Sequence, residues 1–68
     1  MNEDNLNMEI RKFLKKVGIT SQRLIESSIH DADTKGKIKR GDEIILEMTL
    51  NIKSLNNENK IHGTIKID

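Results

Sequence analysis

The chain has no cysteine, no proline, no tryptophan and no tyrosine, and its only aromatic residue is Phe13. Without cysteine there is no disulfide to constrain the fold and no thiolate ligand for a metal. No proline, repeat or low-complexity tract marks a linker, so we expect one small domain over residues 1–68. A chain of this length buries little apolar area by itself, and self-association that adds buried area is therefore expected.

An excess of one charge is also missing, because 12 lysines and arginines face 11 acidic residues, for a net charge of +1. A nucleic-acid-binding domain usually carries a marked basic excess, so any basic feature here must be local. The longest apolar run, Ile44 to Leu46, is far too short to span a membrane. The start, MNEDNLNMEI, is acidic and polar, unlike a secretory signal. These features predict a cytoplasmic protein that does not contact a membrane.

Apolar residues near the start recur at helical spacing. They are Leu6, Ile10, Phe13, Leu14 and Val17. This spacing predicts an amphipathic helix. Glu3 and Asp4 fall in its first turn, where negative charge suits the helix dipole. Gly18 follows the last apolar residue, and glycine often ends a helix in the left-handed conformation. We therefore expect a first helix that stops at Gly18.

A second helix is predicted directly after this glycine. Thr20 can cap it, and Ile19 and Leu24 have the spacing of a hydrophobic staple. Its apolar stripe is weaker and runs through Leu24, Ile25, Ile29 and Ala32, with Ser28 among them. The polar stretch DADTKGK then predicts a helix end near residues 32–35. The two helices would form a hairpin with its corner at Gly18.

The pattern changes to alternation after Gly41. Residues 44–52 place an isoleucine, leucine or methionine at every second position, which predicts a half-buried strand. Residues 61–67 alternate in the same way, and the segment SLNNENK between them predicts the turn of an antiparallel pair.

The expected fold class is thus α+β: an N-terminal two-helix hairpin packed on a C-terminal two-stranded antiparallel β-hairpin. A two-stranded ribbon is marginally stable and has two open edges. We expect it to be completed either by dimerisation through strand edges or by a short third strand around Ile38.

The corner at Gly18 invites comparison with a DNA-binding helix-turn-helix. In that interpretation Gln22 and Arg23 would reach the bases from the start of the second helix. Leu14 stands where a small residue is usual, however, and Ser27 stands where an apolar one is usual. A purely structural corner is the better interpretation.

Four basic residues follow the predicted helices within six positions: Lys35, Lys37, Lys39 and Arg40. This cluster could attract phosphates or an acidic protein, and it could equally be a solvated loop. No aromatic residue lies nearby to stack on a base, which argues against single-strand recognition.

The sequence contains few candidate residues for catalysis or for binding a metal ion. Glu26, His30, Asp31 and Asp33 include only one histidine, and they are better explained as helix-surface ion pairs and caps. There is no thiol nucleophile and no glycine-rich phosphate loop. We expect no catalytic residue, no metal and no cofactor, and therefore no enzyme.

The segment MNEDNLNMEIRKFLKKVGITSQRLIE resembles the start of a family of short bacterial proteins known only as a domain of unknown function. Members share MNED, an IRKFLK-x-VG helix and SQR-x-IE. The resemblance is strong over residues 1–26 and looser beyond them. The segment SSIHDADTKGK departs from the alanine-rich, basic second helix of the relatives. The resemblance implies a self-standing small protein and carries no activity.

The sequence therefore predicts a non-catalytic interaction module of the bacterial cytoplasm. Its contact surfaces would be the strand edges and the basic loop, with an acidic protein as partner. The alternative is nucleic-acid binding through Gln22, Arg23 and the basic cluster at 35–40.

Overall fold

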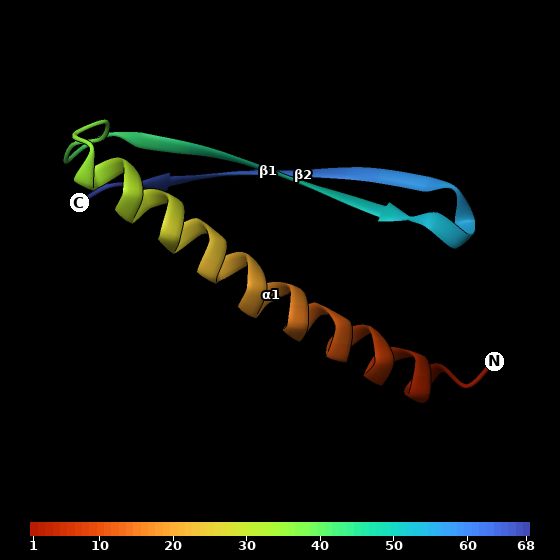
Figure 1. The fold of residues 1–68 in the computed structure, drawn as a ribbon. Coiled ribbons are helices and arrows are strands. Elements are labelled where there is room, and N and C mark those ends of the chain that lie inside the picture. The colour runs from red at the N-terminus through yellow and green to blue at the C-terminus, as the bar shows by residue number, and fades with distance from the viewer. The chain divides into compact units, whose positions relative to one another are not determined.

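The computed structural model describes residues 1–68 and contains one helix followed by one β-hairpin (Figure 1). Helix α1 spans Glu3–Thr34, strand β1 spans Glu43–Ile52, a short 3-10 turn η1 spans Lys53–Leu55, and strand β2 spans Asn57–Lys66. The chain divides into two compact units, Met1–Lys37 and Ile38–Asp68. The protein thus belongs to the α+β class, as the sequence predicts.

Helix α1 begins where its first backbone donors find a side-chain partner. The side chain of Asn2 accepts a hydrogen bond from the backbone N–H of Asn5 at 3.0 Å. Glu3 and Asp4 occupy the first turn, so their negative charges face the positive end of the helix dipole. The predicted helix start is confirmed.

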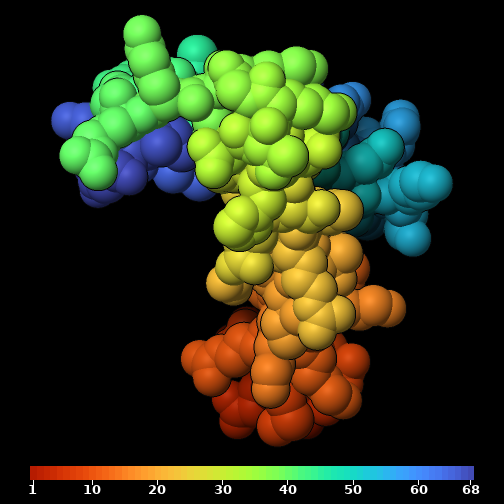
Figure 2. Space-filling view, turned by 60° about the vertical axis from the view of Figure 1, so that its left-hand side comes forward, coloured from red at the N-terminus to blue at the C-terminus, as the bar shows by residue number.

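The prediction of two helices is wrong, because α1 runs without a break through Gly18 and Thr20 (Figure 1). In the space-filling view the N-terminal stretch, coloured red to yellow, is a single column of atoms and does not fold back on itself (Figure 2). Gly18 is not among the residues with positive φ, so it does not form the left-handed stop that the corner requires. Thr20 lies inside the helix and caps nothing. The N-terminal two-helix hairpin is therefore replaced by one helix of 32 residues.

The reason for the continuous helix lies in the phase of the apolar stripe. A glycine inside a helix costs only about 1 kcal/mol relative to alanine, and no proline adds a stronger break. From Val17 the stripe steps by four to Ser21 and by three to Leu24, which is the rhythm of a single helix. One amphipathic face therefore runs across Gly18, and the stripe of the second predicted helix is its continuation.

The C-terminal end of α1 lies within the predicted range and has a defined cap. Gly36 has φ of 70°, and its N–H donates to the carbonyl of Asp33 at 3.0 Å. The N–H of Lys37 donates to the carbonyl of Ala32 at 2.9 Å. These two bonds are those of a Schellman motif, in which a left-handed glycine satisfies the last helix carbonyls.

Strands β1 and β2 pair antiparallel, and their register separates an apolar face from a polar one. Ile44 lies opposite Ile65, and Met48 lies opposite Ile61. Because opposed residues of an antiparallel pair project to the same side, these residues share one face with Leu46. The residues between them project to the opposite face and are mostly polar. Ile45 is the apolar exception on that face, and it is 80% exposed. The predicted hairpin and its apolar face are confirmed.

Two details of the predicted hairpin need correction. Strand β2 begins at Asn57, because the turn is confined to η1 and Asn56, whose φ of 51° reverses the chain. The third strand proposed around Ile38 does not form, since the sheet has only β1 and β2. Residues near Ile38 belong to the helix cap and to a turn, in which the Asp42 N–H donates to the Lys39 carbonyl at 3.1 Å.

No residue of the chain is buried in the structure. The most protected side chains are half-buried. On α1 they are Val17, Ser21, Ile25, Ile29 and Ala32, and in the hairpin unit they are Ile38, Asp42, Ile44, Leu46, Leu50 and Ile67. Each unit has an apolar face and neither has a core of its own.

Candidate functional site

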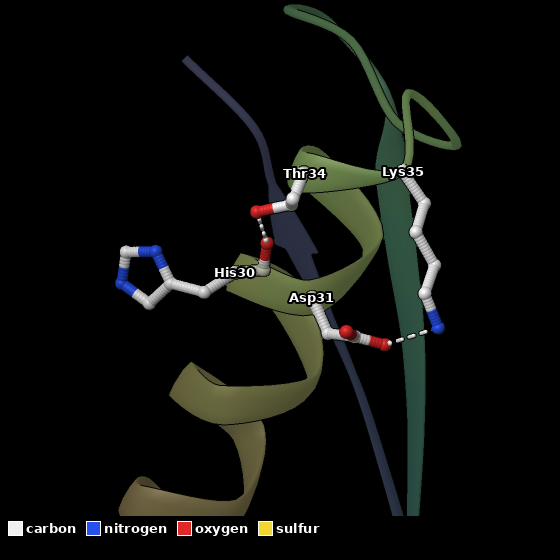
Figure 3. A network of polar contacts seen from close by, with 4 residues as sticks. All are labelled: His30, Asp31, Thr34 and Lys35. Carbon is white, nitrogen blue, oxygen red and sulfur yellow. Dashed lines mark hydrogen bonds and ion pairs between the residues drawn. The ribbon is translucent and has the colours of Figure 1, made fainter.

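The basic loop, residues 35–40, joins α1 to the hairpin and contains the densest positive charge in the chain. Its first member is already neutralised, since the Lys35 ammonium lies 3.0 Å from a carboxylate oxygen of Asp31, one helical turn earlier (Figure 3). Both side chains are exposed, so the pair adds little stability.

The other three basic residues of the loop, Lys37, Lys39 and Arg40, form no ion pair within the chain. All three are exposed. The backbone N–H of Lys39 donates to a carboxylate oxygen of Asp42 at 3.0 Å, and this bond helps to close the turn at residues 39–42. The loop backbone is thus held by its own hydrogen bonds, while three positive charges remain free to bind an anionic group.

Gln22 and Arg23 lie in the middle of α1 and not at the start of a recognition helix. The Gln22 amide nitrogen donates to a carboxylate oxygen of Glu26 at 2.9 Å, so it already has a partner on its own helix. Arg23 is twelve residues from Lys35, which corresponds to about 18 Å along the helix axis. The helix therefore separates these two residues from Lys35, the first basic residue of the loop.

The acidic and histidine side chains near the end of α1 interact with their own helix. The His30 carbonyl accepts a hydrogen bond from the Thr34 hydroxyl at 3.0 Å, while the His30 imidazole and the Asp31 carboxylate point to different sides (Figure 3). No group of three or more histidine, cysteine or acidic residues is placed to hold a metal ion. The sequence predicted that these residues form surface ion pairs and caps. Asp31 does form a surface ion pair, with Lys35.

A second polar cluster lies on the hairpin, where Glu47 sits between two basic partners. Its carboxylate oxygens lie 3.6 Å from the Lys60 ammonium and 3.6 Å from Nδ1 of His62. Glu47 lies directly opposite His62, with Lys60 two positions along the same strand. The sequence alone does not indicate this cluster. It could have been found only from the strand register, which sets residues 47 and 62 side by side.

The hairpin presents two further surfaces to a partner. Its sheet has only two strands, so neither outer edge is paired with a further strand. On its apolar face Ile61 is 60% exposed and Met48 is 40% exposed. An extended segment could pair with an edge and place apolar side chains against this face.

Helix α1 is too polar to be a membrane span, and no other helix of the chain qualifies. Among protein-family models, one described as "Family of unknown function (DUF6494)" matches residues 1–68. No curated protein and no solved structure matches the chain.

Proposed function

The chain belongs to the family of unknown function DUF6494, and we propose that it is a non-catalytic interaction module of the bacterial cytoplasm that binds an acidic protein segment. The observation that carries the proposal is the group of three unpaired cations, Lys37, Lys39 and Arg40. The bacterial setting rests on the resemblance of residues 1–26 to short bacterial proteins.

The charge of the loop supports an anionic partner. Exposed cations without an internal acceptor keep their full attraction for carboxylates, and they raise the rate of encounter with an acidic surface. The loop directly precedes β1, and residues 39–42 form a closed turn. A partner drawn to Lys39 and Arg40 is thereby brought to the first residues of a strand that has an open edge.

Strand addition is the binding mode that we favour for the partner. An extended segment paired with the edge of the hairpin gains main-chain hydrogen bonds, and its alternate side chains can cover the apolar face. Carboxylates at the end of such a segment would meet the loop. The expected partner is thus an acidic protein segment with alternating apolar residues.

Nucleic acid is a weaker candidate after the structural correction. The helix-turn-helix has no basis in a continuous α1, which leaves only the loop to contact phosphates. Three phosphate contacts without base recognition would give weak, strongly salt-dependent binding. Nucleic acid therefore serves as an outcome of the experiment below.

The test is affinity capture from a nuclease-treated bacterial lysate, with the bound proteins quantified by mass spectrometry. We expect the unmodified chain to enrich one acidic protein or a few. The variant K37E/K39E/R40E should lose at least tenfold of that enrichment, because three attractive contacts become repulsive.

The matched control is R11E/K12E/K15E, which reverses three exposed cations of α1 and leaves the loop unchanged. It should retain the same proteins. Equal loss in both variants would show non-specific attraction and overturn the proposal. Retardation of a DNA duplex or a single strand at about 50 mM salt, lost in the loop variant alone, would replace the protein partner by nucleic acid.

A further inference from the structure

The first two thirds of α1 carry a row of apolar side chains that are exposed except at Val17, which is half-buried. Phe13 is 55% exposed and Leu24 is 64% exposed, although both are among the largest apolar residues of the helix. The members of this apolar row are Leu6, Ile10, Phe13, Val17 and Leu24, with Leu14 on its flank. An exposed row of this kind marks a surface that another protein element covers.

The hairpin is too short to cover the whole helix. At 1.5 Å per residue α1 is about 48 Å long, whereas strands of ten residues at about 3.4 Å per residue extend about 34 Å. Some 14 Å of helix, between two and three turns, lies beyond the reach of the hairpin in any arrangement of the two units. The part of the apolar row on those turns therefore needs a partner from outside the chain.

The spacing within the row indicates that this partner is another helix. Its positions follow steps of four, three, four, three and four if Thr20 is included: Leu6, Ile10, Phe13, Val17, Thr20 and Leu24. Alternating steps of four and three residues keep one seam of a helix facing a second helix, as in a coiled coil.

We infer that α1 pairs with α1 of a second copy of this chain, and that the two helices run antiparallel. A parallel in-register pair would set Glu3 against Glu3 and Asp31 against Asp31, since both residues share the seam position of Ile10, Val17 and Leu24. Like charges within a seam oppose this arrangement.

An antiparallel pair avoids that conflict. If it is centred near residue 15, Leu6 lies opposite Leu24 and Phe13 lies opposite Val17. At the flank Glu9 of each helix lies near Arg23 of the other, which gives two attractive pairs. Only the two Lys16 side chains meet as like charges, on the same flank near the centre. Both the charge pattern and the apolar pattern thus favour the antiparallel orientation.

This inference does not depend on the proposed function, because the seam uses residues 6–24 of α1 and not the basic loop. The loop variant K37E/K39E/R40E should remain a dimer, and a dimer-breaking variant keeps the loop charges. Failure of one proposal therefore leaves the other standing.

The test uses single cysteines in the full chain, which has no native cysteine to interfere. Leu14→Cys lies close to the symmetry axis and should form a disulfide-linked dimer in air. When Leu6→Cys and Leu24→Cys chains are mixed, with a larger tag on one of the two, the disulfide-linked product should be mainly the mixed pair. Lys12→Cys on the opposite side of the helix is the control and should remain largely monomeric on a non-reducing gel.

The charge pairs supply a second, independent readout by light scattering. Glu9→Arg alone and Arg23→Glu alone should each weaken the dimer roughly three- to tenfold, because two pairs become repulsive. The double variant E9R/R23E should return to within about twofold of the unmodified chain. Rescue by the double exchange cannot be explained by misfolding.

Three results would overturn the inference. A mass of 7.8 kDa at every concentration up to several hundred micromolar would show that no second copy covers the row. Efficient Leu6→Cys homodimers without the mixed pair would show parallel helices. A dimer insensitive to Glu9→Arg and to Phe13→Ser would place the interface elsewhere, such as at the strand edges.

Discussion

Three residues at the ends of regular elements have backbone requirements that most residue types do not meet: Asn2, Gly36 and Asn56. Asn2 accepts the N–H of Asn5, and Gly36 and Asn56 take the positive φ that ends the helix and turns the hairpin. Glycine tolerates positive φ because it has no Cβ. Asparagine tolerates such positions because its side chain can form hydrogen bonds with nearby backbone groups. The polar composition of the sequence predicted the region of each boundary. The individual residue could be identified only from the backbone dihedral angles.

The first prediction concerns Gly18 and separates one helix from two. Apart from its chain neighbours and the backbone of its own helix, a methyl group added to the Gly18 Cα would meet no atom within 4 Å, and the φ of this residue is not positive. Gly18→Ala should therefore stabilise the chain by about 0.5–1 kcal/mol, through better helix propensity. Urea unfolding followed by circular dichroism measures the change.

The control is Gly36→Ala, where φ is 70° and an alanine is strained. It should destabilise by about 1 kcal/mol. If Gly18→Ala destabilised the chain to the same extent, a left-handed corner would have to exist at Gly18 in solution.

The second prediction concerns the hairpin turn. Asn56 has φ of 51°, which a β-branched side chain adopts only with strain. Asn56→Val should cost about 1–2 kcal/mol of unfolding free energy, whereas Asn56→Gly should change it by less than about 0.5 kcal/mol. Thermal unfolding of the two variants, compared with the unmodified chain, would contradict this assignment if both were equally destabilised.

At the scale of the element, the rhythm of apolar residues predicted the kind of each element better than its limits. Alternation from Ile44 onward gave the hairpin, and helical spacing gave the helical half. The corner at Gly18 was predicted because cap-like residues surround it. The in-phase step from Val17 to Ser21 and Leu24 is the stronger signal, since a tertiary face that continues outweighs one unfavourable residue.

Some candidate residues could be recognised from the sequence, and others only from the structure. The basic loop was visible in the sequence as a local excess of charge, and the structure leaves three of its four cations unpaired. The cluster around Glu47 was not visible, because it depends on which residue of β1 meets which residue of β2. Pairing across strands is set by register and by the turn, which composition does not reveal.

The third prediction tests that register. Glu47→Lys would place a second positive charge beside that of Lys60, and like charges across a strand pair destabilise it by roughly 0.2–1 kcal/mol. Adding Lys60→Glu should recover most of this loss. The measurement is the unfolding free energy in urea at low salt, and the absence of any recovery in E47K/K60E would show that the two residues are not neighbours.

At the scale of the whole molecule, the main property is that no side chain is buried. Folding free energy comes largely from removing apolar area from water, so a chain with two apolar faces and no core gains stability when those faces are covered. For this protein, association and stability are therefore expected to be linked.

The fourth prediction follows from that link. The midpoint of thermal unfolding should rise with protein concentration, because a dimer unfolds to two separate chains. We expect an increase of several degrees between about 5 and 500 micromolar, measured by circular dichroism. Phe13→Ser should remove most of the dependence by disrupting the apolar row. A midpoint that is constant over this range would show that the chain is stable without a second copy.

The connection between the helix and the hairpin is shorter than its sequence suggests. Lys37 still bonds to the helix through Ala32, and the Gly41 N–H already bonds to the carbonyl of Ile67 at 2.6 Å as an extension of the strand ladder. Lys39 is closed onto Asp42. Only Ile38 is left to act as a joint, so a glycine-serine spacer inserted there would lengthen the tether without breaking a bond of either unit. The protein could then be used as a pair of separable parts, each tested for its own binding.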